Sequence, residues 1–306
     1  MSCLKGKTEL LYSKTFDCAN NRQELADLLE ESQQTLSLGV GSCSVIVGDS
    51  GSGKTTLVKA FIKRFNEKHS TDVSENKSIK ACYIRSPSNM SPLDLYRAIL
   101  VGMAEPGSIQ GSEVELRRRI AQQVKNKRYR VLVFDEFQQV VEKVGVKSAR
   151  QIADYLKELV DELGLFLVFA GTSKVMNILE INEQFASRCS LIIEKKLLSV
   201  STRKNYVHFV KYLITLNEHL KFSQIDFTNP EISLPIFAMT KGDLRQLSML
   251  IRKAIFHACD KNRDEVLVKD FAAVFSSISV SKKNQANPFS KKFSLLKAEL
   301  GVNYEL

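Results

Sequence analysis

A glycine-rich stretch near the start of the chain has the residue types and the spacing of a phosphate-binding loop. It reads Gly48, Asp49, Ser50, Gly51, Ser52, Gly53, Lys54, Thr55 and Thr56. The glycines let successive backbone N–H groups turn toward phosphate oxygens, the Lys54 ammonium reaches the β- and γ-phosphates, and the Thr55 hydroxyl can coordinate Mg²⁺. We therefore predict that these nine residues bind ATP together with Mg²⁺.

The segments on either side of this loop match that chemistry. An apolar, β-branched run, Ser44 to Val47, leads into the loop, and residues 56–65 leave it with apolar side chains at helical spacing. A strand followed by a glycine loop and a helix lets the helix N-terminus help to hold the phosphates. The competing interpretation, a glycine- and serine-rich surface turn, does not account for these neighbours.

Two carboxylates follow a second apolar strand, Val131 to Phe134. In a parallel sheet, Asp135 and Glu136 would lie at the edge that carries the phosphate loop. Asp135 is predicted to hold Mg²⁺ through water, and Glu136 to orient and polarise the attacking water, which is most of what phosphoryl transfer requires. The alternative is an acidic cap at the end of a buried strand.

The order of elements predicts how these residues are positioned. Strands are expected at 44–47, 81–84, 129–134, 165–170 and 190–193, with helices between them, and helices alone follow from residue 198. This pattern predicts an α/β fold with a five-stranded parallel sheet and a small C-terminal helical lid. The expected regions are an accessory helix region (1–40), a nucleotide-binding α/β domain (41–197), the helical lid (198–280) and a basic, mobile tail (281–306).

Composition and charge narrow the class of protein. The chain of 306 residues is 44% hydrophobic, and it has no apolar run long enough to cross a bilayer and no signal-peptide core. Its six cysteines are scattered without metal-ligand spacing, so we expect a cytoplasmic protein with reduced thiols. The net charge of +10 suggests an acidic polymer as partner, and seven basic residues without an acidic one lie between Arg117 and Arg130. A solvated basic face is the alternative.

Further polar residues fall at the strand ends and in the lid in an order that resembles the AAA+ ATPases. The resemblance implies that Thr172 senses the γ-phosphate, that Arg188 acts as an arginine finger on the nucleotide of a neighbouring subunit, and that Arg245, in the stretch 242–245, is a second sensor acting in cis. Each has a simpler interpretation, respectively a helix N-cap, a surface arginine and an exposed residue at a capped helix start.

Several segments are also similar to the TniB/TnsC family of AAA+ ATPase regulators of DNA transposition, found in Tn7-like and CRISPR-associated transposons. They are Tyr83-Ile84-Arg85, Phe134-Asp135-Glu136-Phe137-Gln138, residues 168–172, residues 184–188, Thr240-Lys241-Gly242 and residues 247–254. The resemblance implies a protein that assembles with ATP into a ring or filament on double-stranded target DNA and marks the insertion site. It implies recruitment of the transposase, engagement of a TniQ-like target selector, and disassembly on hydrolysis.

The same resemblance implies that residues 86–91 and 112–119 face the DNA. Ser112, Arg117, Arg118 and Arg119 are the expected phosphate contacts, which would position the duplex without reading its sequence. A different class of function also fits the nucleotide motifs, namely a STAND-like signalling or defence NTPase switch that binds a protein partner without DNA. A secretion-associated ATPase of the ExeA type would be expected to carry a membrane segment or a large periplasmic extension.

Overall fold

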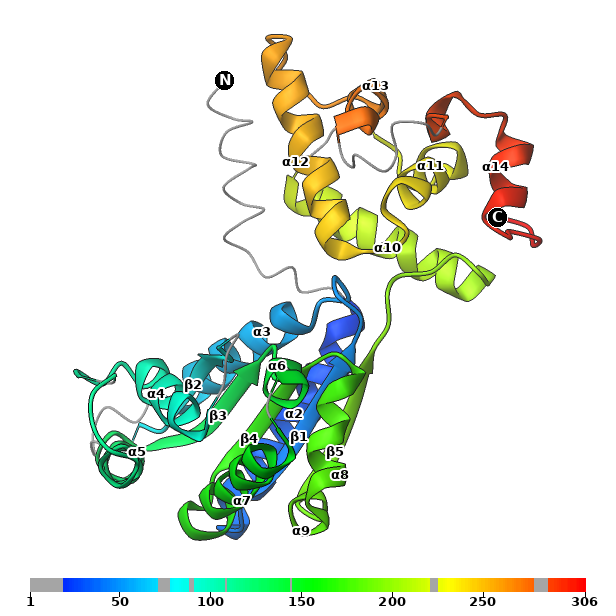
Figure 1. The fold of residues 1–306 in the computed structure, drawn as a ribbon. Coiled ribbons are helices and arrows are strands. Elements are labelled where there is room, and N and C mark those ends of the chain that lie inside the picture. The colour runs from blue at the N-terminus through cyan, green and yellow to red at the C-terminus, as the bar shows by residue number, and fades with distance from the viewer. Residues whose placement is uncertain are drawn as a thin grey trace. The chain divides into compact units, whose positions relative to one another are not determined.

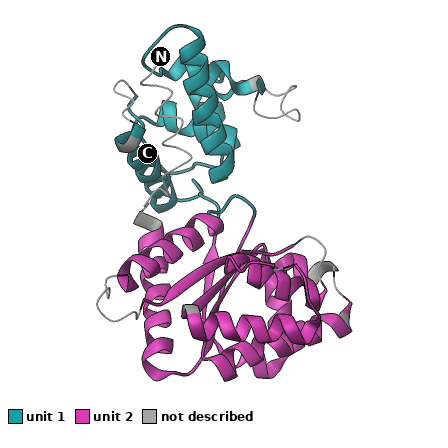
Figure 2. Cartoon of the chain, turned by 90° about the vertical axis from the view of Figure 1, so that its left-hand side faces the viewer, with its two compact units in different colours: residues 1–19, 50–53, 196–306 teal, residues 20–49, 54–195 magenta. Residues whose placement is uncertain are grey.

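The computed structural model describes residues 19–70, 78–87, 91–107, 109–143, 145–220, 225–277 and 286–306. The chain forms two compact units (Figures 1 and 2). The α/β unit comprises residues 20–49 and 54–195, and the helical unit comprises residues 196–306 together with residues 50–53 of the glycine-rich loop. None of the helices in the described part of the chain combines the length and apolar composition that a membrane span requires.

The α/β unit is built on one five-stranded parallel sheet, which confirms the predicted fold class. The strands are β1 (Ser42–Gly48), β2 (Lys80–Arg85), β3 (Tyr129–Asp135), β4 (Phe166–Gly171) and β5 (Cys189–Lys195). Their order in the sheet is β2-β3-β4-β1-β5, and every neighbouring pair is parallel. Parallel neighbours need crossover connections, which the intervening helices supply.

Helices cover both faces of this sheet. They are α2 (Ala19–Leu38), α3 (Lys54–His69), α4 (Pro92–Gly102), α5 (Glu113–Lys127), α6 (Gln138–Lys143), α7 (Val146–Leu163), the 3₁₀ turn η1 (Ser173–Met176), α8 (Asn177–Ile181) and α9 (Glu183–Ala186). Side chains alternate along β1, so Val45 belongs to the hydrophobic cluster that contains side chains of α4, α5 and α7, whereas Ile46 belongs to the one that contains side chains of α2 and α3. Both are fully buried, which is why this strand reads as a continuous apolar run.

The helical unit has a separate hydrophobic core. Its elements are α10 (Arg203–Leu220), α11 (Pro230–Thr240), α12 (Leu244–Asp260), α13 (Val268–Ala273), η2 (Phe275–Ser277), η4 (Pro288–Ser290) and α14 (Phe293–Glu299). Leu213, Leu250 and Phe271 are among its buried residues. The turn before α12 requires a glycine, because Gly242 has φ +75° and an added Cβ would lie 1.8 Å from the Leu198 carbonyl oxygen.

The chain's last residues differ from the mobile tail that we expected. Residues 278–285 lie outside the described residues, but residues 286–306 pack on the helical unit. Leu296 and Val302 belong to its core, and the Tyr304 hydroxyl donates a hydrogen bond to the Val200 carbonyl oxygen at 2.7 Å. We expected mobility because the stretch is rich in lysine, but its apolar side chains pack on the core of the helical unit.

The expected DNA-facing stretch 112–119 is almost entirely helical. The helix α5 begins already at Glu113, so the three consecutive arginines lie within it. Ser112 is its N-cap, and it exchanges hydrogen bonds with Glu115 as a capping box. The spacing of these two residues is a sequence signal for a helix start.

Asp270 ties α12 to α13 in the helical unit, and this generates a testable prediction. Its fully buried carboxylate accepts hydrogen bonds from Arg263, from His257 Nδ1 at 2.7 Å and from the Leu267 N–H at 2.7 Å. Burial alone would raise the pKa of this carboxyl, but the hydrogen bonds outweigh burial and lower that pKa below its usual range.

We expect Asp270→Ala to lower the free energy of unfolding by about 2 kcal/mol at pH 7, because bonds to a charged acceptor are lost. Since the folded-state pKa is the lower one, this stabilisation is complete above the unfolded value of about 3.9 and disappears as the pH falls through the folded value. Urea unfolding followed by circular dichroism at pH 7 and near pH 3 measures both effects. Asp260→Ala, at an exposed position on α12, is the control, and an equal loss in the two variants would contradict the prediction.

Candidate functional site

The glycine-rich loop joins β1 to α3, as the sequence predicts for a phosphate-binding loop. Gly48 ends β1, and Lys54 is the first residue of α3. Gly51 and Gly53 have φ values of +81° and +94°, which only glycine adopts readily. The Lys54 ammonium is buried and donates hydrogen bonds to the carbonyl oxygens of Gly48 and Asp49, both at 2.8 Å. The lysine therefore lies across its own loop.

The Thr55 hydroxyl meets the carboxylate at the end of β3. Thr55 Oγ1 donates a hydrogen bond to Asp135 Oδ2 at 2.8 Å, and the Tyr83 hydroxyl donates to the same oxygen at 2.7 Å. Asp135 is only 2% exposed. Burial raises the pKa of Tyr83, and its bond to Asp135 raises it further, so this hydroxyl stays a donor. Two oxygen ligands that suit Mg²⁺ are thus adjacent.

Glu136 follows Asp135 in an unusual backbone conformation. Its φ is +56°, in the left-handed region that a non-glycine residue occupies at a cost. Its N–H donates a hydrogen bond to Asp135 Oδ1 at 3.0 Å, and its carboxylate accepts one from Gln138 Nε2 at 2.6 Å. The side chains of Asp135 and Glu136, although adjacent in sequence, therefore have different hydrogen-bond partners.

Thr172 begins the segment that follows β4. Its side chain makes no capping bond to the turn η1, of which it is the N-cap. The Thr172 Oγ1 atom is buried and has no hydrogen-bond partner among the described residues, and the same holds for Ser52 Oγ in the glycine-rich loop. Buried hydroxyls without a partner are uncommon, and a bound ligand is one explanation for them.

Arg188 lies immediately before β5 and is held from α7. Its Nε and Nη2 atoms donate hydrogen bonds to the two carboxylate oxygens of Asp161, at 2.6 and 2.9 Å. This bidentate contact raises the pKa of the Arg188 guanidinium further, so the side chain is a permanent cation. Both side chains are about one-third exposed, so the pair contributes little to stability and can be exchanged for another partner.

Arg245 belongs to the helical unit, where it is the second residue of α12 and is exposed. Its backbone N–H donates a hydrogen bond to the N-cap Asp243 at 2.7 Å. The predicted lid sensor thus stands at the start of a capped helix, as its sequence position suggested.

The three arginines of α5 have unequal surroundings. Arg117 bonds to Glu158 of α7 and lies over the Tyr155 ring, and Arg119 bonds to Glu105 and to the Gln110 carbonyl oxygen. The Arg118 side chain is exposed. Two of the expected DNA contacts therefore also serve as structural ion pairs, and Ser112 serves as a helix cap. Of the other expected DNA-facing segment, residues 88–90 lie outside the described residues.

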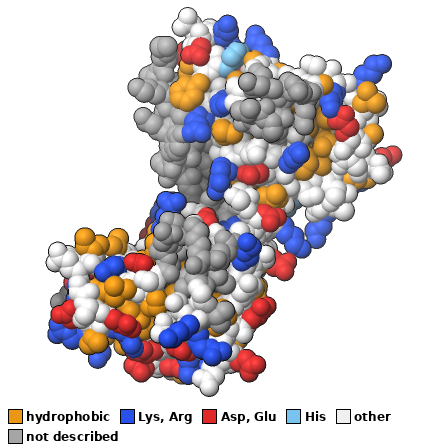
Figure 3. All heavy atoms as spheres, in the orientation of Figure 1, with side chains coloured by type: hydrophobic (Ala, Val, Ile, Leu, Met, Phe, Trp, Pro, Cys, Tyr) orange, Lys and Arg blue, Asp and Glu red, His pale blue; other side chains and the backbone are white. Residues whose placement is uncertain are grey.

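The surface shows the same intermixing of charge. On the face drawn in Figure 3, Lys and Arg side chains are interspersed with Asp and Glu side chains, even though the chain carries a net charge of +10. The sign and size of the net charge therefore do not by themselves locate a binding surface.

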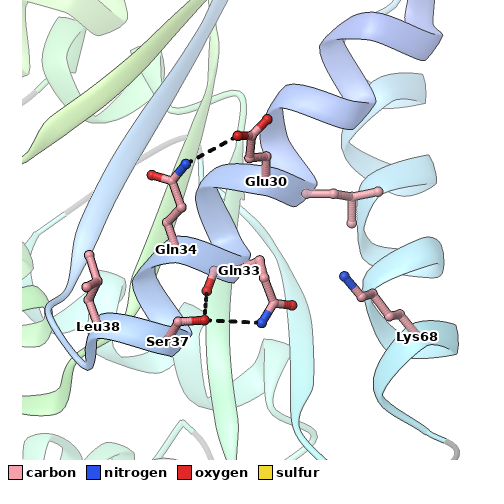
Figure 4. A pocket seen from close by; sticks show the side chains of 7 residues that line it. Glu30, Gln33, Gln34, Ser37, Leu38 and Lys68 are labelled. Carbon is pink, nitrogen blue, oxygen red and sulfur yellow. Dashed lines mark hydrogen bonds between the residues drawn. The ribbon is translucent and has the colours of Figure 1, made fainter.

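A hollow between α2 and α3 lies away from the phosphate-binding loop. It is lined by Leu29, Glu30, Gln33, Gln34, Ser37, Leu38 and Lys68 (Figure 4). Lys68 stands fourteen residues beyond Lys54 on α3, which is about 20 Å along a helix. The hollow and the cluster around Thr55 are thus distinct features of this unit.

Three residues of the site were not assigned a role from the sequence. Tyr83 and Gln138 bond to Asp135 and Glu136, and Asp161 holds Arg188. Tyr83 and Asp161 bond to residues that are distant in sequence, and the bond of Gln138 to Glu136 depends on the backbone turn between them. A single sequence reveals neither the distant contacts nor the turn. A tyrosine near the end of a strand, or a glutamine soon after two acidic residues, is the only local signal.

Comparisons with known proteins agree with this architecture. A family profile described as "TniB: Bacterial TniB protein" matches residues 10–196, which is more than half of the chain. No curated protein matches the chain.

Solved structures share the fold at low sequence identity. The Aeropyrum pernix ORC2 protein (ADPNP-ADP complexes) aligns at 16% identity over 86% of this chain and 71% of that chain, with a TM-score of 0.67. The A. pernix ORC1 protein in complex with DNA aligns at 19% identity over 89% and 69%, also with a TM-score of 0.67. Domain III of the Thermotoga maritima replication initiation protein DnaA aligns at 17% identity over 86% and 94%, with a TM-score of 0.56. The fold is therefore that of the AAA+ proteins.

The shared oxygen of Asp135 leads to a prediction about Tyr83. Both lone pairs of Oδ2 are engaged by Thr55 and Tyr83, so a metal ion or its water bound at this atom would have to compete with a hydroxyl. Tyr83→Phe removes one of these hydrogen bonds, which is worth about 1 kcal/mol. We therefore expect this variant to reach half-saturation of nucleotide binding at a Mg²⁺ concentration up to about fivefold lower than the wild type, because 1 kcal/mol corresponds to about that ratio.

Tyr129→Phe is the matched control, because the Tyr129 hydroxyl donates to the Met103 carbonyl oxygen at 3.0 Å, away from Asp135. Each substitution should destabilise the fold by about 1 kcal/mol. Titration of Mg²⁺ against a fluorescent nucleotide separates the two variants, and an identical Mg²⁺ requirement would contradict the prediction.

Proposed function

Because the chain belongs to the bacterial TniB family, we propose that it is an ATP-dependent, DNA-binding AAA+ regulator of DNA transposition. It assembles on double-stranded target DNA with ATP bound, marks the insertion site, recruits the transposase and engages a TniQ-like target selector. ATP hydrolysis then drives disassembly. The observation that carries the nucleotide part is the meeting of the Thr55 hydroxyl and the Asp135 carboxylate beside Glu136.

Residues of the glycine-rich loop and of the segments after β3 and β4 fit Mg²⁺-ATP. Thr55 and Asp135 would hold the metal ion, which supplies charge neutralisation at the phosphates when it is bound. Lys54 would exchange its two loop carbonyls for phosphate oxygens, and the left-handed glycines allow backbone N–H groups to turn toward them. The buried hydroxyls of Ser52 and Thr172, which have no partner among the described residues, fit hydrogen bonds to the nucleotide.

Hydrolysis requires an oriented water and stabilisation of the charge on the transferred phosphoryl group. Glu136 is the residue to orient the water, Thr172 the one to sense the γ-phosphate, and Arg245 the cis sensor of the lid. Arg188 would act on the nucleotide of a neighbouring subunit after leaving Asp161, whose partly exposed ion pair costs little to break.

Binding of DNA is proposed through the phosphate backbone. The A. pernix ORC1 neighbour was solved in complex with DNA, and this supports the same ligand class for the present fold. Within the basic run of α5, Arg118 is the exposed arginine, so we assign it the main phosphate contact of this helix. We assign a smaller share of the phosphate contacts to Arg117, Arg119 and Ser112, because these residues also hold the helix in place.

The first prediction from this proposal concerns assembly. Electron microscopy of the protein with duplex DNA should show rings or filaments with a slowly hydrolysed ATP analogue and none with ADP.

Lys54→Ala should abolish nucleotide binding and assembly, whereas Glu136→Gln should bind ATP and keep the assembled state. Arg188→Ala should assemble but hydrolyse ATP at least about tenfold more slowly, since an arginine finger contributes far more than this when it operates.

Two outcomes would contradict the proposal. Normal ATP hydrolysis by Glu136→Gln would remove Glu136 from its role. Nucleotide-dependent assembly that is the same with and without DNA, with no DNA bound, would favour the signalling switch that binds a protein partner.

The second prediction concerns Arg118. Arg118→Ala should weaken DNA binding about equally for all duplex sequences and reduce the slope of log affinity against log salt by about 1 for each subunit contact. Arg22→Ala, at an exposed position on α2, is the matched control and should leave the slope unchanged. Fluorescence anisotropy over a series of salt concentrations measures both. Equal slopes for the Arg118 variant and the wild type would exclude Arg118 as a phosphate contact.

A further inference from the structure

Gln138, the first residue of α6, connects the end of β3 to the end of β4. Its Nε2 donates a hydrogen bond to Glu136 Oε2 at 2.6 Å, and its Oε1 accepts one from the Thr172 backbone N–H at 3.3 Å. The side chain is only 8% exposed. One amide therefore bridges a carboxylate and the backbone of a residue 34 positions further along the chain.

The surrounding backbone is shaped to admit this amide. The left-handed conformation of Glu136 turns the chain sharply after β3, and the Phe137 N–H then bonds to the Ala170 carbonyl oxygen at 2.9 Å. At Gly171, an added Cβ would lie 2.2 Å from Gln138 Oε1 and 2.4 Å from Val175 Cγ2. A side chain at position 171 would thus displace the amide, and glycine leaves the space that the bridge needs.

We propose that Gln138 is a positioning residue that fixes the Glu136 carboxylate relative to Thr172, so that the two act as one rigid group. The inference rests on the proposed ATP hydrolysis and adds a residue to that site. Glu136 is itself the strained residue of the turn, and without the amide its side chain would be free to rotate about its own torsions. With the amide in place, one carboxylate oxygen is held and the other remains available to a water.

The bridge also gives the site a means of transmission. Thr172 has a buried hydroxyl without a partner among the described residues, and its backbone N–H donates the hydrogen bond that anchors Gln138 Oε1. If a ligand oxygen binds this hydroxyl and shifts Thr172, the Gln138 amide moves with it. The Glu136 carboxylate, which is bonded to the same amide, then moves as well. Misplacement of a reacting group by about 1 Å can cost roughly 100-fold in rate, so the bridge matters to turnover more than to binding.

A purely structural role makes a different prediction. If Gln138 only satisfied buried polar groups, its loss would lower stability without a specific effect on turnover. Gln138→Met keeps the length and volume but removes both hydrogen bonds. Gln138→Glu keeps an acceptor for the Thr172 N–H but loses the donor and brings a second carboxylate toward Glu136.

A matched control exists in the same unit. The Asn66 amide of α3 also makes a donor and an acceptor bond, with the Ala81 carbonyl oxygen at 3.3 Å and the Ala81 N–H at 2.7 Å. Neither bond involves the residues assigned to hydrolysis. Asn66→Leu therefore removes a bridging amide of similar type without touching Glu136 or Thr172.

The experiment measures kcat, KM, affinity for a fluorescent ATP analogue and thermal unfolding, with Mg²⁺ and duplex DNA present. We expect both Gln138 variants to lower kcat by roughly 10- to 100-fold while KM and nucleotide affinity stay within about twofold of the wild type. Asn66→Leu should lower the unfolding temperature and leave kcat within about twofold. A Gln138→Met protein that is folded and has wild-type kcat overturns the inference.

A double-mutant comparison tests whether Gln138 acts through Glu136. In single-turnover measurements, Gln138→Met should slow the wild type by the factor above but slow Glu136→Gln by less than about twofold. An equal slowing in both backgrounds would overturn the assignment. Gly171→Ala, which displaces the amide by another route, should reproduce the loss in kcat.

Failure of the proposed function can be told apart from failure of this inference. If the wild type hydrolyses ATP but does not assemble on DNA, the role in transposition fails and the Gln138 comparison remains decisive. If the wild type does not hydrolyse ATP under any of these conditions, both are overturned.

Discussion

Parallel pairing of the strands is the constraint on which the candidate site depends. Because β1, β3 and β4 run in the same direction, their carboxyl ends meet at one edge of the sheet, and each delivers a polar segment there. The bond between Thr55 and Asp135 joins residues that are 80 positions apart, and no local interaction could bring them together. This register places three segments next to one another at that edge: the start of α3, the strained turn at Glu136 and the segment that begins at Thr172.

The sequence was a good guide to the structure where the pattern of residues is local. A phosphate-binding loop needs its glycines, its lysine and its threonine within a few residues, and two carboxylates after an apolar strand are visible without knowledge of the fold. Tyr83 and Asp161 could not be assigned in this way, because their roles depend on strand register and on the packing of α7. Gln138 lay within a segment that already resembled the family, but its role depends on the left-handed turn at Glu136 and on the glycine at position 171.

Composition misled the interpretation of the C-terminal segment, and α5 shows the same relation between charge and packing. Charge is a property of a segment, whereas packing depends on the spacing of its apolar side chains. In residues 286–306, three lysines are interspersed with apolar residues, of which Leu296 and Val302 are buried in the helical unit. In α5, the run of basic residues coincides with Leu116 and Ile120, which are fully buried, so the segment is also a core helix. In both segments the charged residues occupy the outer face of an element that the apolar residues hold in place.

The pairing of Arg117 and Arg119 within the chain bears on how the protein would hold DNA. A side chain already bound to a carboxylate gains less from a phosphate, because it must first give up its partner. An α5 surface on which Arg117 and Arg119 are already paired would bind a duplex weakly from a single subunit, and the binding would weaken steeply with salt. Subunits linked side by side on one duplex add their contacts, so the assembly binds far more tightly than its members. On the proposed function, whatever controls assembly therefore also controls DNA affinity, and a nucleotide bound at Thr55 and Asp135 can regulate a surface that it never touches.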